Sequence, residues 1–274
     1  MDARLQRRIQ RYGWDLAADD YEALWRSRLA PAHAALLEAA RLSPGQRVLD
    51  VACGAGTIAL RAAAAVGPGG QVMGVDLSGR MIEAARARTA AGGGPGNLRF
   101  ERMDAEALDL PTADFDAVLC GLGLMYAPAP ERALGEMRRV LRPGGRLSLA
   151  VWGERAKCAW AACFPIADAE VSSEVCPLFF RLGQGDALAE ACADQGFVFV
   201  RGQRLPVVLS YASGEEACRA AFVGGPLALA WSRFDAETRA RVSDAYLRAI
   251  APWRTGEGYA MPGEFVVVSA CAPW

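Results

Sequence analysis

The residues with the clearest chemical signature are two carboxylates beside a glycine-rich turn. The apolar run Val48–Ala52 contains Asp50 and leads into Gly54 and Gly56. Glycines at such a turn let a ligand approach the backbone, and a helix that begins beyond it offers unpaired N–H donors. Asp76 ends the next apolar run, twenty residues after Gly56. This spacing fits the relaxed dinucleotide-binding pattern, which is a weak signal when it stands alone.

The charge at the turn distinguishes between possible ligands. Asp50 lies on the predicted strand just before the glycines, where a carboxylate repels a pyrophosphate and complements a cation. Asp76 ends the second strand, where it could accept hydrogen bonds from two ribose hydroxyls. The alternative is purely structural, with ordinary turn glycines and Asp76 as a helix cap. The order and spacing of these residues favour the ligand site.

The elements that must position these residues alternate between strands and helices from residue 47 to residue 153. The predicted strands are Arg47–Ala52, Val72–Asp76, Leu98–Met103, Phe115–Cys120 and Arg146–Trp152, and the predicted helices are Thr57–Val66, Gly79–Ala91 and Glu131–Leu141. Strands that are apolar throughout are typical of a parallel sheet buried on both faces. The alternation predicts an α/β fold, doubly wound and Rossmann-like, with a mostly parallel sheet.

We expect two further strands, which make the sheet seven-stranded, and three parts within one domain. The later elements are helices over Asp186–Gln195, 213–222 and 235–251, and strands over Gly196–Leu209 and Glu264–Cys271. Residues 1–46 are expected to form an N-terminal helical lid that contains a basic segment, Leu5–Tyr12, and an amphipathic helix, Tyr21–Leu42. Residues 47–153 form the ligand-binding core. Residues 154–274 supply substrate-covering insertions and the last strands, and 154–183 are expected to be a helical cover over the carboxyl edge of the sheet.

Composition excludes several classes of function. The 30 basic and 31 acidic residues leave a net charge of −1, so a basic stripe for nucleic acid is not expected. No uncharged run reaches the roughly 18 residues of a membrane span, and the charged N-terminus lacks a secretory signal, which favours a cytoplasmic protein. His33 is the single histidine, so a multi-histidine metal site is impossible. The eight cysteines are scattered and are expected to be reduced thiols.

Taken together, the motifs resemble class I S-adenosylmethionine-dependent methyltransferases, of the small-molecule branch that includes the ubiquinone/menaquinone-biosynthesis C-methyltransferases. The matching stretches, which cover residues 47–153, are VLDVACGAGTIAL, VMGVDLSGRMIEAAR, ERMDAEALDLPTADFDAVLC and GLGLMYAPAPERALGEMRRVLRPGGRLSLAVWG. The resemblance implies S-adenosylmethionine as the cofactor and S-adenosylhomocysteine as the product. It also implies a small, hydrophobic or aromatic methyl acceptor. No metal is required, and the oligomeric state is left open.

The resemblance further implies roles for individual residues. The cofactor-binding residues that it implies are Asp50, Ala52, Gly54, Gly56, Asp76, Leu77, Met81, Asp104, Ala105, Cys120, Gly121 and Leu122. The first four would line the methionyl moiety, and Asp76 would hold the ribose. Asp104 would accept the adenine amino group. Ala52 departs from the family, which often has glycine at this position.

Residues outside these motifs are candidates for a wall around the methyl donor and for contact with the methyl acceptor. Tyr21, one of four aromatic residues with Tyr12, Trp14 and Trp25, could lie near the donor's carboxylate or sulfonium, although packing on the sheet is the alternative. His33 could be the general base for a hydroxyl acceptor, or an ordinary helix residue.

Tyr126 is a candidate for contact with the acceptor. Three arginines could bind an anionic acceptor or simply be solvated: Arg26, Arg28 and Arg181. Six aromatic residues could line an acceptor pocket or belong to the core: Trp160, Phe164, Phe179, Phe180, Phe222 and Trp231.

Rival functions remain open at this point. A nicotinamide-dependent dehydrogenase of similar fold is disfavoured by Asp50, which would face the pyrophosphate. A nucleic-acid methyltransferase would usually carry an Asn/Asp-Pro-Pro-aromatic motif after the fourth strand, where this chain has Gly121-Leu122-Gly123-Leu124. A non-catalytic domain that keeps S-adenosylmethionine as a structural or regulatory ligand is the third alternative.

Overall fold

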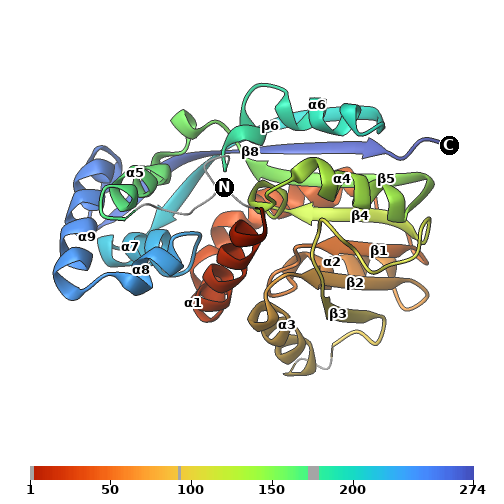
Figure 1. Ribbon diagram of the computed structural model, residues 1–274, viewed down its shortest axis with the longest axis horizontal. Coiled ribbons are helices and arrows are strands. Elements are labelled where there is room, and N and C mark those ends of the chain that lie inside the picture. The colour runs from red at the N-terminus through yellow and green to blue at the C-terminus, as the bar shows by residue number, and fades with distance from the viewer. Residues whose placement is uncertain (1–2, 92–93, 172–178) are drawn as a thin grey trace.

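The computed structural model describes residues 3–91, 94–171 and 179–274, which are arranged around one sheet (Figure 1). The strand order is β3-β2-β1-β4-β5-β8-β6, with the short β7 beside β8. The strands are β1 Arg47–Val51, β2 Gln71–Asp76, β3 Leu98–Arg102, β4 Phe115–Gly121, β5 Leu141–Trp152, β6 Val198–Tyr211, β7 Arg254–Thr255 and β8 Gly258–Cys271. Strands β1 to β5 are parallel, whereas β8 is antiparallel to β5 and β6. The predicted α/β fold with a mostly parallel sheet is confirmed.

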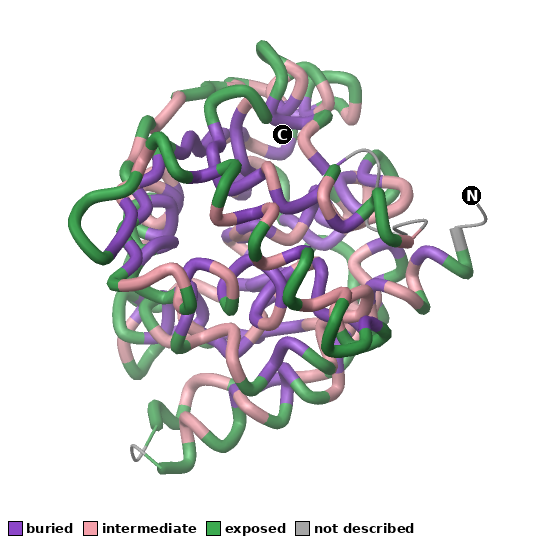
Figure 2. The backbone as a smooth tube through the Cα atoms, turned by 90° about the vertical axis from the view of Figure 1, so that its left-hand side faces the viewer, coloured by how far each residue is buried: buried purple, intermediate pink, exposed green. Residues whose placement is uncertain are grey.

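Two cores lie on opposite faces of this sheet because successive strand residues point in opposite directions. Val48 packs in one core with helices α2 (Thr57–Val66) and α3 (Gly79–Ala91). Leu49 packs in the other with α4 (Pro130–Val140) and α6 (Ala187–Asp194). Figure 2 shows the buried backbone gathered inside, with the exposed segments outside it. The strands are therefore apolar at nearly every position, as the sequence pattern indicated.

The N-terminal segment is a single helix, α1 (Ala3–Ala40), where the sequence predicted two separate pieces. Its polar middle is fixed by contacts with the start of α3. Asp15 accepts a hydrogen bond from the Ser78 hydroxyl at 2.6 Å, and Asp19 pairs with Arg80 at 2.9 Å. Carboxylates are favourable at the amino end of a helix, so these contacts stabilise a stretch that has no apolar period of its own.

The remaining helices lie mostly beyond α1, on the left of Figure 1. They include α5 Cys163–Asp168, α7 Gly214–Phe222, α8 Ala228–Arg233 and α9 Ala236–Ile250, with short 3-10 turns η1 Leu124–Tyr126, η2 Arg155–Lys157, η3 Ala159–Ala162, η4 Arg181–Gly183 and η5 Ala251–Trp253. The segment expected to be a helical cover, 154–183, contains η2, η3, α5 and η4. Part of it, 172–178 with Cys176, lies outside the described residues. No helix in the described part of the chain is long and apolar enough to cross a membrane.

Candidate functional site

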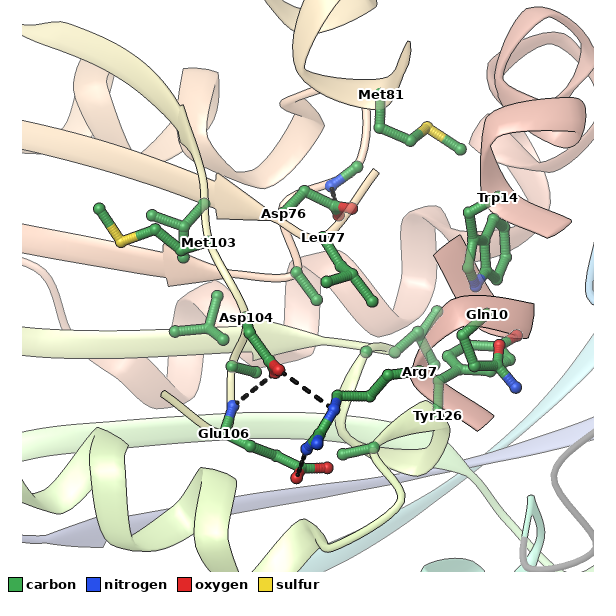
Figure 3. A pocket seen from close by; sticks show the side chains of 18 of the residues that line it. Arg7, Gln10, Trp14, Asp76, Leu77, Met81, Met103, Asp104, Glu106 and Tyr126 are labelled. Carbon is green, nitrogen blue, oxygen red and sulfur yellow. Dashed lines mark hydrogen bonds and ion pairs between the residues drawn. The ribbon is translucent and has the colours of Figure 1, made fainter. Parts of the chain in front are cut away.

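A cavity that is partly open to solvent lies where the loops after the parallel strands meet the first half of α1 (Figure 3). Ligands of α/β sheets bind outside the carboxyl ends of the strands. Its lining comprises Arg7, Gln10, Trp14, Tyr21, Val51, Ala52, Gly54, Val75, Asp76, Leu77, Met81, Met103, Asp104, Ala105, Glu106, Gly121, Leu122, Gly123, Tyr126, Ala127 and Pro128.

The carboxylate of Asp50 lies behind the glycine turn and has no adequate partner. It is fully buried, and neither oxygen accepts a hydrogen bond of normal geometry from the described residues. Burial raises the pKa of Asp50 well above its usual value, although the backbone N–H of Ala59 favours the charged form. A buried, unpaired carboxylate is costly. A hydrogen-bond donor or a cation near Asp50 would therefore stabilise this carboxylate.

The backbone at the ends of β1 and β4 is conformationally unusual. Ala52 and Leu122 both have positive φ, 55° and 65°, a region that non-glycine residues rarely adopt. A Cβ added to Gly123 would lie 2.2 Å from the Cβ of Ala52. Gly123 therefore makes room for the methyl group that distinguishes Ala52 from the glycine often found in the resembling family. Strained backbone of this kind clusters at ligand-binding sites.

Asp76 joins the loops that follow β1 and β2. Its Oδ2 accepts a hydrogen bond from the Gly54 N–H at 2.9 Å, and its Oδ1 accepts one from the Ser78 N–H at 2.8 Å. Burial raises the pKa of Asp76, and these two N–H donors oppose the shift. Each carboxylate oxygen has a second lone pair, so both oxygens can accept a further bond from a ligand in the cavity.

Two acidic residues that line the cavity, Asp104 and Glu106, form ion pairs with an arginine of α1. Arg7 donates a hydrogen bond from Nη1 to Glu106 Oε2 at 2.6 Å, and its Nε lies 3.5 Å from Asp104 Oδ2. Asp104 Oδ1 accepts the Glu106 N–H at 2.9 Å. Figure 3 shows Arg7 reaching from α1 toward both carboxylates, with Leu77 on the same side of the cavity as Asp76.

Three aromatic rings also line the cavity. Trp14 lies edge-on to Tyr21 with ring centroids 5.3 Å apart, and edge-on to Tyr126 at 5.0 Å. Burial, reinforced by the charges of Glu22 and Asp76, raises the pKa of Tyr21, so its hydroxyl stays protonated at neutral pH. The wall is apolar and cation-compatible because ring faces attract positive charge.

The cavity brings together most of the residues singled out from the sequence. Those that line it are Tyr21, Ala52, Gly54, Asp76, Leu77, Met81, Asp104, Ala105, Gly121, Leu122 and Tyr126. Asp50, Gly56 and Cys120 lie behind the lining. Gly56 is required for a structural reason, because a Cβ there would lie 2.7 Å from the Phe100 ring.

His33 is placed outside this cavity. It is buried at 7% exposure on the later part of α1, and burial together with the nearby charge of Arg61 lowers its pKa to about 4. This position does not support its expected role as a general base, because a base must reach the proton that it removes.

The other candidates, which include Arg26 and Arg181, also lie outside the cavity lining. Arg28 is buried and pairs with Glu216 at 2.8 Å. Of the aromatic residues of α1, Tyr12 is exposed, and Trp25 packs against Trp152 and Trp160. None of the six other aromatic residues considered for an acceptor pocket lines the cavity described above: Trp160, Phe164, Phe179, Phe180, Phe222 and Trp231.

The sequence reasoning missed two residues in the first turns of α1, Arg7 and Gln10, which line the cavity. Trp14, one of the four aromatic residues considered from the sequence, also lines it. Their spacing of three and four residues, continued at Tyr21, places them on one helix face. That spacing was the available signal, but a face with Arg and Gln also suits a solvated helix.

Comparison with known proteins finds similarity to methyltransferases in the part of the chain that holds the glycine turn. Residues 48–145 match the family model described as "Methyltransferase domain". The chain is 39% identical over 136 residues to an uncharacterised protein of Mycobacterium tuberculosis, which covers 50% of this chain and 48% of that protein. It is 41% identical over 111 residues to the ubiquinone/menaquinone biosynthesis C-methyltransferase of Ectopseudomonas mendocina, with 40% and 43% covered. The matched part thus spans about half the length of these curated relatives.

A solved structure with the same fold supports the assignment of the fold. It is phosphoethanolamine N-methyltransferase 2 of Haemonchus contortus in complex with S-adenosyl-L-methionine, with a TM-score of 0.60 and 17% identity. The similarity covers 95% of this chain and 57% of that one. The resemblance inferred from the sequence motifs is confirmed for the segment that holds the glycine turn and Asp76.

Proposed function

We propose that this protein, in which residues 48–145 match a methyltransferase-domain family, transfers the methyl group of S-adenosylmethionine to a small-molecule acceptor. S-adenosylhomocysteine is then the product. The observation that carries the proposal is the buried Asp50, whose two oxygens have no adequate partner directly behind the glycine turn. Because Asp50 lies behind the cavity lining, a ligand with an ammonium group near a sulfonium would offset this carboxylate from across the glycine turn.

The other residues of the cavity fit the same cofactor. Asp76 has two lone pairs left for the ribose hydroxyls, and Leu77 and Met81 provide an apolar surface for the adenine. Asp104 would accept the adenine amino group. Gly54, with φ of 53°, brings the backbone to the cavity without a side chain in the way. The proposed cofactor-binding set is the one implied by the sequence resemblance.

The chain's own contribution to catalysis is positioning and exclusion of water. When bound, the cofactor supplies a methyl group already activated by the positive sulfur. Tyr21, Trp14 and Tyr126 surround the expected position of that sulfur with ring faces and edges, and they replace water with an apolar wall. Holding donor and acceptor in line accounts for a large part of the rate in such a transfer.

The attacking atom of the methyl acceptor must already be nucleophilic when the acceptor enters the described cavity. Among the described lining residues, Asp76, Asp104 and Glu106 already accept hydrogen bonds, and Tyr21 stays protonated. We therefore favour an acceptor whose attacking atom needs no strong base, and a hydrophobic or aromatic body that suits the wall at Tyr126.

The dehydrogenase alternative fits the site less well. A dinucleotide would place its pyrophosphate at the glycine turn, where the unpaired carboxylate of Asp50 is buried. The remaining alternative is a domain that binds S-adenosylmethionine without turnover.

Two measurements test the proposal. Calorimetric titration should detect binding of S-adenosylmethionine and S-adenosylhomocysteine and no binding of NAD. An assay of S-adenosylhomocysteine release over a panel of phenols, quinols, carboxylates, amines and thiols should then identify an acceptor class. Binding without release on any acceptor would favour the non-catalytic alternative, and preferential binding of NAD would overturn the proposal.

A further inference from the structure

The first turns of α1 make a polar connection across the cavity that the proposed function does not use. Arg7 spans from α1 to Glu106, 99 positions away in the chain, with a bond of 2.6 Å. The Glu106 side chain is only 2% exposed, whereas that of Arg7 is 25% exposed. Figure 3 draws the Asp104 and Glu106 carboxylates on the far side of Arg7 from Trp14.

Glu106 depends on this connection because of how its two oxygens are occupied. Oε1 accepts the N–H of Ala129, just before α4, and Oε2 accepts the Arg7 guanidinium. A buried carboxylate that loses its cationic partner is strongly unfavourable. Arg7 thus ties together α1, the loop after β3 and the start of α4.

Asp104 is held differently and keeps capacity for a ligand. Its Oδ1 accepts the Glu106 N–H, whereas its Oδ2 is 3.5 Å from Arg7, a looser contact than the one to Glu106. Oδ2 can therefore accept a further donor such as an exocyclic amino group. Neutralisation of Glu106 by Arg7 also prevents two adjacent carboxylates from repelling each other at the place where that amino group would bind.

We propose that Arg7 is a cofactor-positioning residue, which neutralises Glu106 and closes α1 over the adenine end of the cavity so that Asp104 meets the adenine amino group. This inference rests on the proposed function, because it assumes that the adenine lies between Leu77, Met81 and Asp104. Arg7 acts through the two carboxylates and through α1, and it leaves the reacting atoms untouched.

The test is the binding of ligands that carry adenine, measured by calorimetry on the full chain. Arg7→Ala should weaken binding of S-adenosylhomocysteine by roughly 10- to 100-fold. Methylthioadenosine, which has the adenine and ribose without the amino-acid portion, should lose affinity by the same factor. The matched control is Arg8→Ala, which removes the same charge from an exposed neighbouring position and should bind both ligands as the unaltered chain does.

A second variant separates positioning from simple loss of structure. Glu106→Gln in the Arg7→Ala background removes the unpaired charge and should recover part of the lost affinity. Should Arg7→Ala fail to fold, Arg7→Lys is the replacement, with a smaller loss expected because lysine keeps the charge but cannot reach both carboxylates as a fork does.

The outcomes distinguish this inference from the function on which it rests. If the unaltered chain binds no S-adenosylmethionine or S-adenosylhomocysteine, the proposed function itself fails. If the unaltered chain binds them and Arg7→Ala binds them as tightly as Arg8→Ala does, the positioning role of Arg7 is overturned. A loss for S-adenosylhomocysteine with none for methylthioadenosine would likewise overturn it, because Arg7 would then act at the methionyl end.

Discussion

At the scale of a single residue, Asp76 accepts two hydrogen bonds from backbone N–H groups and is proposed to accept two more from the ribose of the cofactor. Its substitution therefore tests where the cofactor binds. Asp76→Ala should lower the affinity for S-adenosylmethionine and S-adenosylhomocysteine in parallel, by roughly 10- to 1,000-fold. The parallel loss is expected because both ligands have the same ribose. Calorimetric titration of both ligands against the folded variant measures it.

The control for Asp76 is Asp109→Ala, which removes a carboxylate at an exposed position away from the cavity lining. It should bind both ligands normally. Unchanged affinity of Asp76→Ala for both ligands would mean that the carboxylate only anchors the Gly54 and Ser78 N–H groups. A defect restricted to the sulfonium ligand would move Asp76 away from the ribose.

Ala52 and Gly123 should be energetically coupled, because a Cβ on Gly123 would lie 2.2 Å from that of Ala52. Gly123→Ala should lower the free energy of unfolding by about 1–3 kcal/mol through overpacking. Ala52→Gly should change it by less than about 1 kcal/mol, since relief of the positive φ is offset by the greater freedom of glycine in the unfolded chain.

The double variant completes a double-mutant cycle and shows whether the two positions are coupled. Ala52→Gly/Gly123→Ala should recover a large part of the stability lost in Gly123→Ala, although the new Cβ would still be 3.2 Å from Cys120 Sγ. Chemical denaturation of the four proteins gives the coupling energy. Additive effects would show that the loops separate freely and that the contact imposes no constraint.

His33 should make stability depend on pH, since its pKa is about 4 in the folded protein against 6.5 ordinarily. Between these values the unfolded chain binds the proton more readily. Stability is therefore fully present above pH 6.5 and is lost as the pH falls toward 4. The loss is of the order of 3 kcal/mol at most.

A comparison with His33→Gln isolates this effect, because His33 is the single histidine. Denaturant unfolding at pH 7.5 and at pH 5 should show a smaller difference in the variant than in the unaltered chain. An equal pH dependence in the two proteins would show that His33 does not titrate in this range. Because His33 lies outside the cavity lining, binding of S-adenosylhomocysteine at pH 7.5 should be unchanged.

At the scale of the element, α1 has two halves with different surroundings. Residues 7–21 include the cavity wall, whereas Leu36 and Ala40 pack in the core with α2. If the first half is the lid expected from the sequence, binding of S-adenosylhomocysteine should slow amide hydrogen exchange in residues 7–21 far more than in 32–40. Mass spectrometry of exchanged peptides measures both halves in one experiment, so the second half is the internal control. Equal protection of the two halves would contradict the lid.

The elements differ in how far local sequence could predict them. Strands β1 to β4 and helices α2 and α3 were predicted within one or two residues because a buried parallel strand and an amphipathic helix have strong local patterns. The continuity of α1 was not predicted. Its middle is held by Asp15 and Asp19 through contacts with Ser78 and Arg80, and such tertiary contacts leave no periodic signal.

The same distinction applies to the site. Asp76 and Tyr126 could be predicted because the carboxyl ends of parallel strands meet at one edge, whereas Asp104 was implied by the family resemblance. Arg7 and Gln10 could not, since no local rule says which helix face is turned toward a cavity. For His33 the sequence left two alternatives, a general base or an ordinary helix residue, because residue type alone does not place a side chain within reach of a cavity.

At the scale of the whole molecule, the sheet is completed by its last strand. β8 lies between β5 and β6 and is antiparallel to both, pairing along Arg146–Trp152 of β5 and along most of β6. Leu147, Leu149 and Val151 of β5 are fully buried as a result. Although residues 48–145 match the domain family, the core around β5 depends on residues more than a hundred positions later.

Removal of β8 should therefore abolish cooperative folding of the entire chain, including the cavity at the carboxyl ends of β1, β2 and β4. A chain truncated after Glu257 exposes one edge of β5 and one of β6, and it leaves buried apolar residues of both cores without cover. We expect such a chain to aggregate or to show no sigmoidal denaturant transition, and to bind no S-adenosylhomocysteine. The control truncation removes only Pro273 and Trp274, which are exposed, and should keep both properties.

A chain without β8 that still unfolds cooperatively and binds the ligand would show that residues 1–153 are an independent folding unit. The later strands would then be an attachment to that unit, and the single-domain organisation expected from the sequence would be wrong.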